Sequence, residues 1–260
     1  MRDTRDMLLV LLSSLLMLTG CSRRDILDDY PVSGVEISLD WNGVTNKLPE
    51  GVRVIFYPKN AEGRKIDTYL SVKGGKVKVP PGRYSVVVYN YDTETVQIRG
   101  EEAYETIEAF TGHCNGLGIA GTEQLVWGPD PLYVVRIDDL KIENSEEELQ
   151  LNWKPKLVVK TYSFKLKVQG LEYVSSIVGS IEGMSSCYDL GLGCGKAGDS
   201  PIYFAARGSA GEVTGSFTVF GTSEGVISRA GNAIKLTLAF VKTDNKVQNC
   251  LLYTSDAADD

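Results

Sequence analysis

Short runs in which apolar and polar residues alternate dominate the chain after residue 33. In residues 35–40, Val, Ile and Leu alternate with Glu, Ser and Asp. A period of two residues points successive side chains to opposite faces of a half-buried strand. Similar or β-branched runs predict strands at 52–57, 66–72, 77–79, 83–89, 149–153, 157–168, 175–181, 216–220 and 234–241. No helical period of useful length interrupts them, so we predict an all-β protein built from antiparallel sandwiches.

Turn-forming residues punctuate these runs. Pro58 ends the second strand, and Pro80-Pro81-Gly82 separates the fourth from the fifth. Gly74-Gly75 is predicted to be the turn of a hairpin, because both residues tolerate positive φ. Pro155 follows a strand-like run, and we place a domain boundary there. The prediction is two tandem β-sandwich domains, at 33–154 and 155–249, without an evident internal repeat.

The first twenty residues read as an export signal rather than as part of the fold. The apolar stretch from Met7 to Leu18 is shorter than the roughly 20 residues that span a bilayer. Leu18-Thr19-Gly20-Cys21 then resembles the lipobox of bacterial lipoproteins. We therefore expect cleavage before Cys21, lipid on its thiol, and a short tether at 21–32. The alternative is an uncleaved signal anchor with an incidental cysteine.

Residues 250–260 resemble the translated end of a transposon-based sequencing adapter. We expect them to be a library scar, so that the natural protein continues beyond Asn249 and the second domain is incomplete. An ordinary polar tail is the alternative.

The composition of residues 21–249, without the export signal and the C-terminal segment, argues against some classes of function. The remaining piece carries 25 basic and 29 acidic residues, a mild acidity without the basic patch that nucleic-acid binding requires. Of the five cysteines, only Cys114, Cys187 and Cys194 remain, so at most one pair can close. Cys187 and Cys194 flank a glycine-rich loop and are the candidate disulfide of an oxidising compartment. Two free, partly buried thiols are the alternative.

Candidate chemistry is sparse. His113 is the single histidine, which argues against a histidine metal cage. Its neighbour Cys114 would point away from it, so a glycine-rich surface loop is the preferred interpretation over a nucleophilic pair. The acidic clusters at 138–139 and 146–148 are expected to be solvated loop charge and lack calcium-loop spacing. The segment 191–195 lacks the Gly-Lys-Ser/Thr ending of a phosphate loop. We predict no catalytic residue, no metal and no cofactor.

The three tryptophans leave carbohydrate binding open as an alternative function. Trp41, Trp127 and Trp153 would stack on sugar rings if they were exposed, but such residues more often fill a sandwich core.

Several segments resemble the fimbrillin-like surface lipoproteins of Bacteroidetes. They are the lipobox, Asp28-Asp29-Tyr30, the run from Gly51 to Pro58, the segment Pro80 to Asn90, the segment Phe217 to Gly221, and Leu236 to Phe240. The resemblance implies two β-sandwich domains, the first transthyretin-like, and lipid attachment in the outer membrane at the cell surface. It further implies a role in a fimbrium or as an adhesin, with fimbrial subunits or other surface proteins as partners.

In fimbrillin stalk subunits, as the resemblance implies, proteolysis at an arginine after the first strand frees a strand-accepting groove. The loop from Asn42 to Gly51 contains Lys47 and no arginine, which suits an anchor subunit. We therefore expect a non-catalytic surface lipoprotein for fimbrial anchoring, assembly or adhesion. A lipid-tethered carbohydrate-binding module is the alternative, and a tethered hydrolase comes third.

Overall fold

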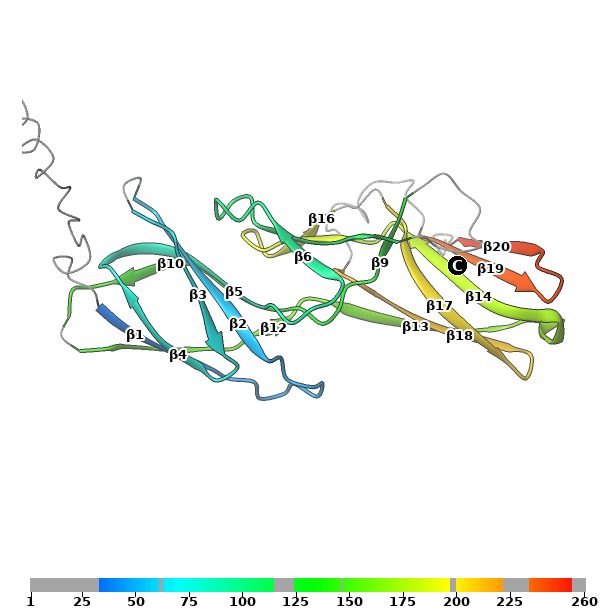
Figure 1. Ribbon diagram of the computed structural model, residues 1–260, viewed down its shortest axis with the longest axis horizontal. Helices are drawn as coiled ribbons and strands as arrows, with labels where there is room; N and C mark the ends of the chain where they lie inside the picture. The colour runs from blue at the N-terminus through cyan, green and yellow to red at the C-terminus, as the bar shows by residue number, and fades with distance from the viewer. Residues whose placement is uncertain are drawn as a thin grey trace, which may run out of the picture.

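The structure is a computed structural model that describes residues 33–60, 63–114, 124–145, 147–196, 200–221 and 234–253. Within these residues the chain is almost entirely strand, and one 3-10 turn, Leu171–Tyr173, is the sole helical element. The predicted all-β class is confirmed. Three sheets follow one another along an elongated molecule (Figure 1). None of the described residues forms a helix long and apolar enough to cross a bilayer.

Sheet A fills one end of the molecule. Its strand order is β11-β1-β4-β3-β2-β5-β10-β12. The strands are β1 (Ser33–Leu39), β2 (Gly51–Pro58), β3 (Ile66–Ser71), β4 (Gly74–Val79), β5 (Gly82–Asn90), β10 (Tyr133–Ile142), β11 (Leu149–Trp153) and β12 (Lys156–Leu157). The pairs are antiparallel except β1 with β11, which is parallel.

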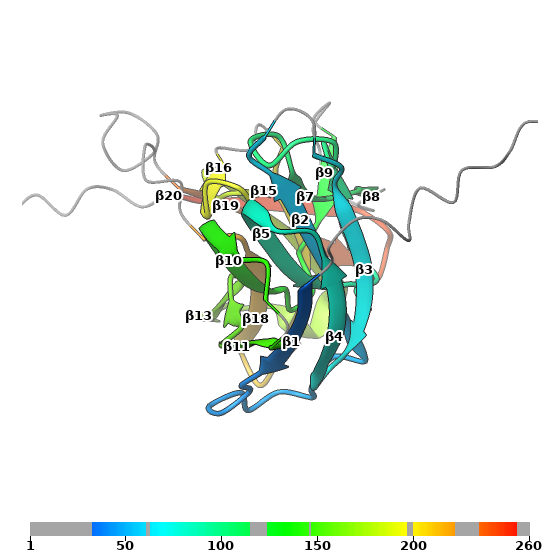
Figure 2. The same cartoon turned by 90° about the vertical axis from the view of Figure 1, so that its left-hand side faces the viewer.

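Sheet A is curled, as the end-on view shows (Figure 2), and it encloses a hydrophobic core of its own. Alternate residues of β1, beginning with Val35 and Ile37, point inward with those of β4, β2 and β5. Phe56, Val86 and Trp153 belong to the same buried cluster. Burying each such side chain contributes about 1.5–3 kcal/mol, so this core carries much of the stability of this end.

The middle strands of sheet A are buried on both faces. Val86 and Val88 point into the first core, whereas Val87 and Tyr89 point into a second core with Ile55. The sequence of a strand that is covered on both faces is a continuous apolar run, and residues 86–89 have this pattern. The second core lies between sheet A and the small sheet B.

Sheet B joins segments far apart in the chain. It contains β6 (Val96–Arg99), β7 (Glu108–Thr111), β15 (Cys187–Asp189) and β16 (Cys194–Lys196), in the order β16-β15-β7-β6. Strands from both sides of the predicted boundary at 154/155 are therefore paired with each other. The division into two separate sandwich domains stays a prediction.

Sheet C fills the other end, in the order β13-β18-β17-β14-β19-β20. Its strands are β13 (Lys160–Lys167), β14 (Val174–Glu182), β17 (Ile202–Ser209), β18 (Glu212–Val219), β19 (Lys235–Lys242) and β20 (Val247–Tyr253). Two short strands, β8 (His113–Cys114) and β9 (Leu125–Trp127), attach through β9 to β17. One face of the sheet builds a third core around Phe204, Leu238 and Phe240.

Two local predictions were wrong. The β3–β4 turn consists of Val72 and Lys73, not of Gly74-Gly75, because both glycines already belong to β4. Gly74 is still required: its φ is 100°, and a Cβ there would lie 2.0 Å from the Ile37 carbonyl oxygen. The predicted strand at 157–168 is divided, since Lys156–Leu157 joins sheet A and Lys160–Lys167 joins sheet C.

The predicted scar also begins inside a strand. Cys250, Leu251 and Leu252 lie in β20 and pair with β19, and residues 254–260 lie outside the described residues. The origin of this segment stays a prediction.

Candidate interaction surfaces

Sheet A has an open seam between its two end strands. β11 pairs with β1 alone, and β10 bonds β12 only at Tyr133 and Val134. In the described part of the chain, the outer edges of β11 and of β10 from Val135 onward have no ladder partner. Leu151 of β11 and Ile137 of β10 are only partly buried there. An open edge beside an incompletely covered core can in general accept an extended strand.

The first strand lies inside sheet A rather than at its edge. β1 pairs with β11 on one side and β4 on the other. Ile37 is 2% exposed and is among the largest fully buried side chains. The loop that follows is exposed at Lys47. Removing β1 would therefore expose the first core and separate β11 from the rest of the sheet.

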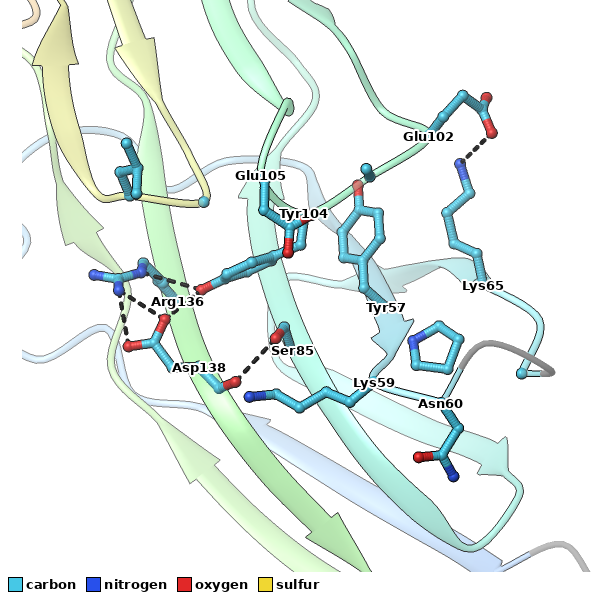
Figure 3. A pocket seen from close by; sticks show the side chains of 15 residues that line it. Tyr57, Lys59, Asn60, Lys65, Ser85, Glu102, Tyr104, Glu105, Arg136 and Asp138 are labelled. Carbon is cyan, nitrogen blue, oxygen red and sulfur yellow. Dashed lines mark hydrogen bonds and ion pairs between the residues drawn. The ribbon is translucent and has the colours of Figure 1, made fainter.

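A polar cleft of about 700 Å³ opens beside the outer face of sheet A (Figure 3). Tyr104 occupies its centre: its hydroxyl accepts a hydrogen bond from Arg136 Nε at 3.1 Å and donates to Asp138 Oδ1 at 2.7 Å. Burial, followed by the bond to Asp138, raises the pKa of Tyr104 to about 12. Tyr104 and Arg136 in turn lower the pKa of the Asp138 carboxyl, so the phenol stays neutral and the carboxylate charged.

The two lysines that line this cleft are also paired with carboxylates. Lys65 Nζ lies 3.9 Å from Glu102 Oε2, and Lys59 Nζ lies 3.7 Å from Asp139 Oδ1. The residues that line the cleft include neither histidine nor cysteine. Among these lining residues, no cysteine–histidine or serine–histidine pair is assembled.

A charge network ties sheet B together across its strands. The Glu108 carboxylate, whose side chain is 10% exposed, accepts hydrogen bonds from Arg99 and from Lys196 Nζ, the latter at 2.7 Å. Lys196 also lies 3.0 Å from the buried Asp189. Burial acts to raise the pKa of Glu108, but the bonds from Lys196 and Arg99 outweigh it and lower the pKa. Glu108 therefore links its own strand β7 to β6, also of the first half, and to β16 of the second half, and Lys196 extends the network to Asp189 of β15.

A second network centres on Arg53 of β2. Its guanidinium donates to both oxygens of Asp67, at 2.9 and 2.7 Å, and to both oxygens of Glu101, at 2.5 and 3.1 Å. The hydrogen bond with Arg53 lowers the pKa of Asp67. A bidentate fork of this kind fixes geometry as well as charge. It ties β2 to β3 and to the loop that follows β6.

The predicted site residues are scattered. Cys21 lies outside the described residues. Cys187 and Cys194 carry free thiols on paired strands, with Cys187 opposite Lys196 and Cys194 opposite Asp189. They are thus diagonal neighbours rather than direct partners, and their disulfide stays a prediction.

Three loop predictions need correction. His113 and Cys114 form a two-residue strand paired with β9, because the chain there runs beside sheet C. Asp138 and Asp139 lie in β10, at a shift of register that turns both side chains toward solvent. The segment 191–195 ends inside β16. Glu148 is an exposed loop charge, as expected, and bonds Lys76 at 2.7 Å.

The tryptophans divide between core and surface. Trp153 is 7% exposed and Trp41 is partly buried in the same cluster, whereas Trp127 is 44% exposed. The preference for a core position was right for the first two and wrong for the third. Trp127 packs edge-on against Tyr203, 5.5 Å between ring centroids. In the described residues no group of three or more His, Cys, Asp or Glu is placed to hold a metal.

Sequence reasoning missed Arg53 and Glu108. Arg53 did carry a signal, since it is a charged residue inside the apolar run 52–57. A buried strand tolerates such a charge only with partners. The partners come from 14 and 48 positions away, and the sequence gives no means of choosing them.

The chain is similar to proteins of Bacteroides. Residues 20–205 match a family model described as "Domain of unknown function (DUF5119)". A Bacteroides ovatus protein named "Putative fimbrium anchoring subunit Fim4B" is 62% identical over 97% of this chain and 79% of its own length.

Solved structures agree with this result. A crystal structure described as a putative adhesin from Bacteroides ovatus is 58% identical, covers 92% of this chain and 88% of that one, and superposes with a TM-score of 0.81. A structure from Bacteroides thetaiotaomicron, described among putative polysaccharide binding proteins, covers 83% of this chain and 78% of its own. At 10% identity and a TM-score of 0.50, that second likeness shows the fold alone. The chain belongs to the DUF5119 family and is a relative of the protein named "Putative fimbrium anchoring subunit Fim4B".

Proposed function

We propose that this protein is a non-catalytic cell-surface lipoprotein that anchors a fimbrium or contributes to its assembly or adhesion. The observation that carries the proposal is the 62% identity, over nearly the whole chain, to the protein named as a fimbrium anchoring subunit. Lipid on Cys21, with palmitate among its acyl chains, would hold the protein in the outer membrane. Partners would be fimbrial subunits rather than nucleic acid.

Two features of the chain support an anchor rather than a stalk subunit. β1 is an interior strand of sheet A, and the loop after it contains Lys47 but no arginine. An anchor must remain bound to its own lipid end, and an uncut first strand keeps the tether joined to the fold. Finding the mature protein cleaved between Trp41 and Arg53 would refute this part of the proposal.

The first test is cross-linking of the full-length protein on intact cells, with mass spectrometry of the partners. Fimbrial subunits are the expected partners. Recovery of glycan-transport components, or of no fimbrial subunit, would contradict the proposal.

The lipid is tested separately by Cys21→Ser, with Cys114→Ser as the matched control that keeps the lipobox. An alkyne-palmitate label should be lost from the first variant and retained by the second, and fimbriae should be released into the medium only by the first. Loss of label with fimbriae still held on the cells would leave adhesion, not anchoring, as the function.

A carbohydrate-binding module is the second candidate. It is favoured by two exposed aromatic side chains, Tyr69 at 60% and Tyr91 at 46%, which pack edge-on with ring centroids 5.2 Å apart. Aromatic rings exposed in this way offer faces for sugar stacking. Glycan-array binding that Tyr91→Ala abolishes would favour this candidate, and no binding to any glycan would remove it.

A further inference from the structure

The polar cleft beside sheet A is built by segments from both halves of the chain (Figure 3). The end of β2 and the loop after it line one part, and residues 102–105, which follow β6, line another. Arg136 and Asp138 come from β10, and Gly191 and Leu192 come from the turn between β15 and β16. The volume of about 700 Å³ lies within the range of about 300–1,000 Å³ that is usual for ligand pockets. The cleft is therefore large enough for a small ligand.

Hydrogen bonds hold the polar groups of this cleft in place. The Tyr104 hydroxyl is fixed between Arg136 Nε and Asp138 Oδ1, at 3.1 and 2.7 Å. The Ser85 hydroxyl donates to the Asp138 carbonyl at 2.9 Å. The β15–β16 turn packs directly on the backbone of Tyr104, because a Cβ at Gly191 would clash with the Tyr104 carbonyl oxygen. A site whose groups are already ordered loses less conformational entropy when a ligand binds.

The charges that line the cleft balance each other. Three are positive and three are negative, namely those of Lys59, Lys65, Arg136, Glu102, Glu105 and Asp138. Charge complementarity therefore favours neither an anionic nor a cationic ligand. An apolar ligand is disfavoured as well, because it would bury these charges without bonding them. A hydroxyl group both donates and accepts hydrogen bonds, so a neutral molecule with several hydroxyl groups can bond both signs of charge.

The paired groups keep spare hydrogen-bonding capacity. Arg136 bonds Tyr104 and Asp138, but a guanidinium carries more N–H donors than these bonds use. The Asp138 carboxylate likewise has acceptor sites left over. Lys59 Nζ lies 3.7 Å from Asp139, which is longer than a direct hydrogen bond, and its side chain points toward Asp138 in Figure 3. A ligand can therefore bond these groups without breaking the network that orders them.

Tyr104 supplies apolar surface inside the cleft. Its ring lies in the middle of the cleft (Figure 3), partly buried against the second core and edge-on to Tyr57, with 5.9 Å between ring centroids. Leu192, which is 62% exposed, adds apolar surface from the other half of the chain. A tyrosine combines an apolar ring with a polar tip. A sugar ring matches this combination, because it carries C–H groups on its faces and hydroxyl groups around its edge.

We propose that this cleft binds a neutral sugar unit of a glycan. The Tyr104 ring would lie against the C–H groups of the sugar, Asp138 would accept hydrogen bonds from its hydroxyl groups, and Arg136 and the nearby lysines would donate to its oxygens. The inference goes beyond the anchoring function and does not depend on it. It rests on the second candidate, glycan binding, and assigns to it a surface that shares no lining residue with the small pocket at Tyr69 and Tyr91.

The test is a glycan array probed with the full chain, carrying neutral oligosaccharides and their sialylated or uronic-acid counterparts. A neutral glycan should bind, and calorimetric titration of that glycan then compares variants. Asp138→Asn removes the carboxylate and should weaken binding about tenfold or more. Asp139→Asn is the matched control, because it makes the same change at the next residue of β10, which does not line the cleft. This control and Tyr91→Ala should leave binding unchanged.

Thermal unfolding checks the fold of these variants. If Asp138→Asn unfolds, Leu192→Ala replaces it, because Leu192 is exposed and its truncation removes apolar surface of the cleft. Binding should then fall about threefold or more. Leu157→Ala, at an exposed leucine outside the cleft, is the control for that variant. Equal binding by the wild type and a folded cleft variant would overturn the proposal, and so would binding of acidic glycans alone.

The outcomes distinguish the cleft from the two candidate functions. If a neutral glycan binds and only Tyr91→Ala abolishes its binding, the cleft is refuted and the glycan-binding candidate stands at the surface of Tyr69 and Tyr91. If no glycan binds, the cleft and that candidate fall together. Neither result changes the anchoring function, which cross-linking to fimbrial subunits tests by itself.

Discussion

The position of β1 inside sheet A makes Ile37→Ala the most informative stability variant. Ile37 is 2% exposed, and its strand separates β11 from β4. Truncation removes buried methylene and methyl groups and leaves a cavity, which typically costs about 2–5 kcal/mol. For a chain of this size, each kcal/mol lowers the melting temperature by about 2–4 °C, so we expect a decrease of about 5–15 °C.

The assay is urea unfolding of the unlipidated full chain, carrying Cys21→Ser. Trp153 belongs to the same core as Ile37, and its fluorescence should report the loss of that core. Ser38→Ala is the matched control, because Ser38 is exposed on the opposite face and its hydroxyl donates one 3.2 Å bond to the Leu151 carbonyl. The control should cost no more than about 1 kcal/mol. If Ile37→Ala costs as little, β1 is not integral to the core, and the structural support for an anchor subunit is lost.

Three further perturbations follow from local geometry. Gly74→Ala should destabilise the protein by more than about 1 kcal/mol, because the φ of Gly74 is 100° and the new Cβ would meet a backbone oxygen. The control Gly75→Ala should cost less, because its Cβ would meet only one side-chain carbon, at 3.3 Å. The midpoints of urea unfolding of the two variants measure this difference. Glu108→Gln should lower stability by about 1 kcal/mol at pH 7. Because the folded pKa of Glu108 is depressed, its contribution is complete above the unfolded value near 4.3 and is lost as the pH falls through the folded pKa. The difference in melting temperature between wild type and variant should therefore shrink as the pH is lowered below about 4.3, and a constant difference would refute the assignment. Arg53→Lys should cost about 2 kcal/mol, because an ammonium cannot reproduce the two bidentate pairs; a melting temperature equal to the wild type would show that the pairs contribute nothing.

The predicted strands that agree with the structure have patterns set by local burial. Residues 35–39 alternate because one face of β1 meets the core, and residues 86–89 are continuously apolar because both faces of β5 are covered. Several of the strands that were missed are short or irregular, but β17, with eight residues, was missed as well. β6, β7 and β9 each have four residues or fewer, and β10 contains two exposed acids at a shift of register, which breaks its alternation. A period is not detectable over so few residues.

Which strand edges are open depends on the order of strands in each sheet. Alternation in residues 160–167 indicates a strand with one apolar face, but the same pattern would suit an interior strand. Only the pairing order places β13 at one end of the described strands of sheet C.

The sequence by itself determined the β class, the family resemblance, and the expectation of lipid on Cys21, because these depend on local patterns and short motifs. The tertiary structure decided the joining of β7 to β15 in sheet B, the ion pairs of Arg53 and Glu108, and, among the described residues, the open seam of sheet A. These features connect residues many positions apart, and local spacing carries no information about which distant strand supplies the partner.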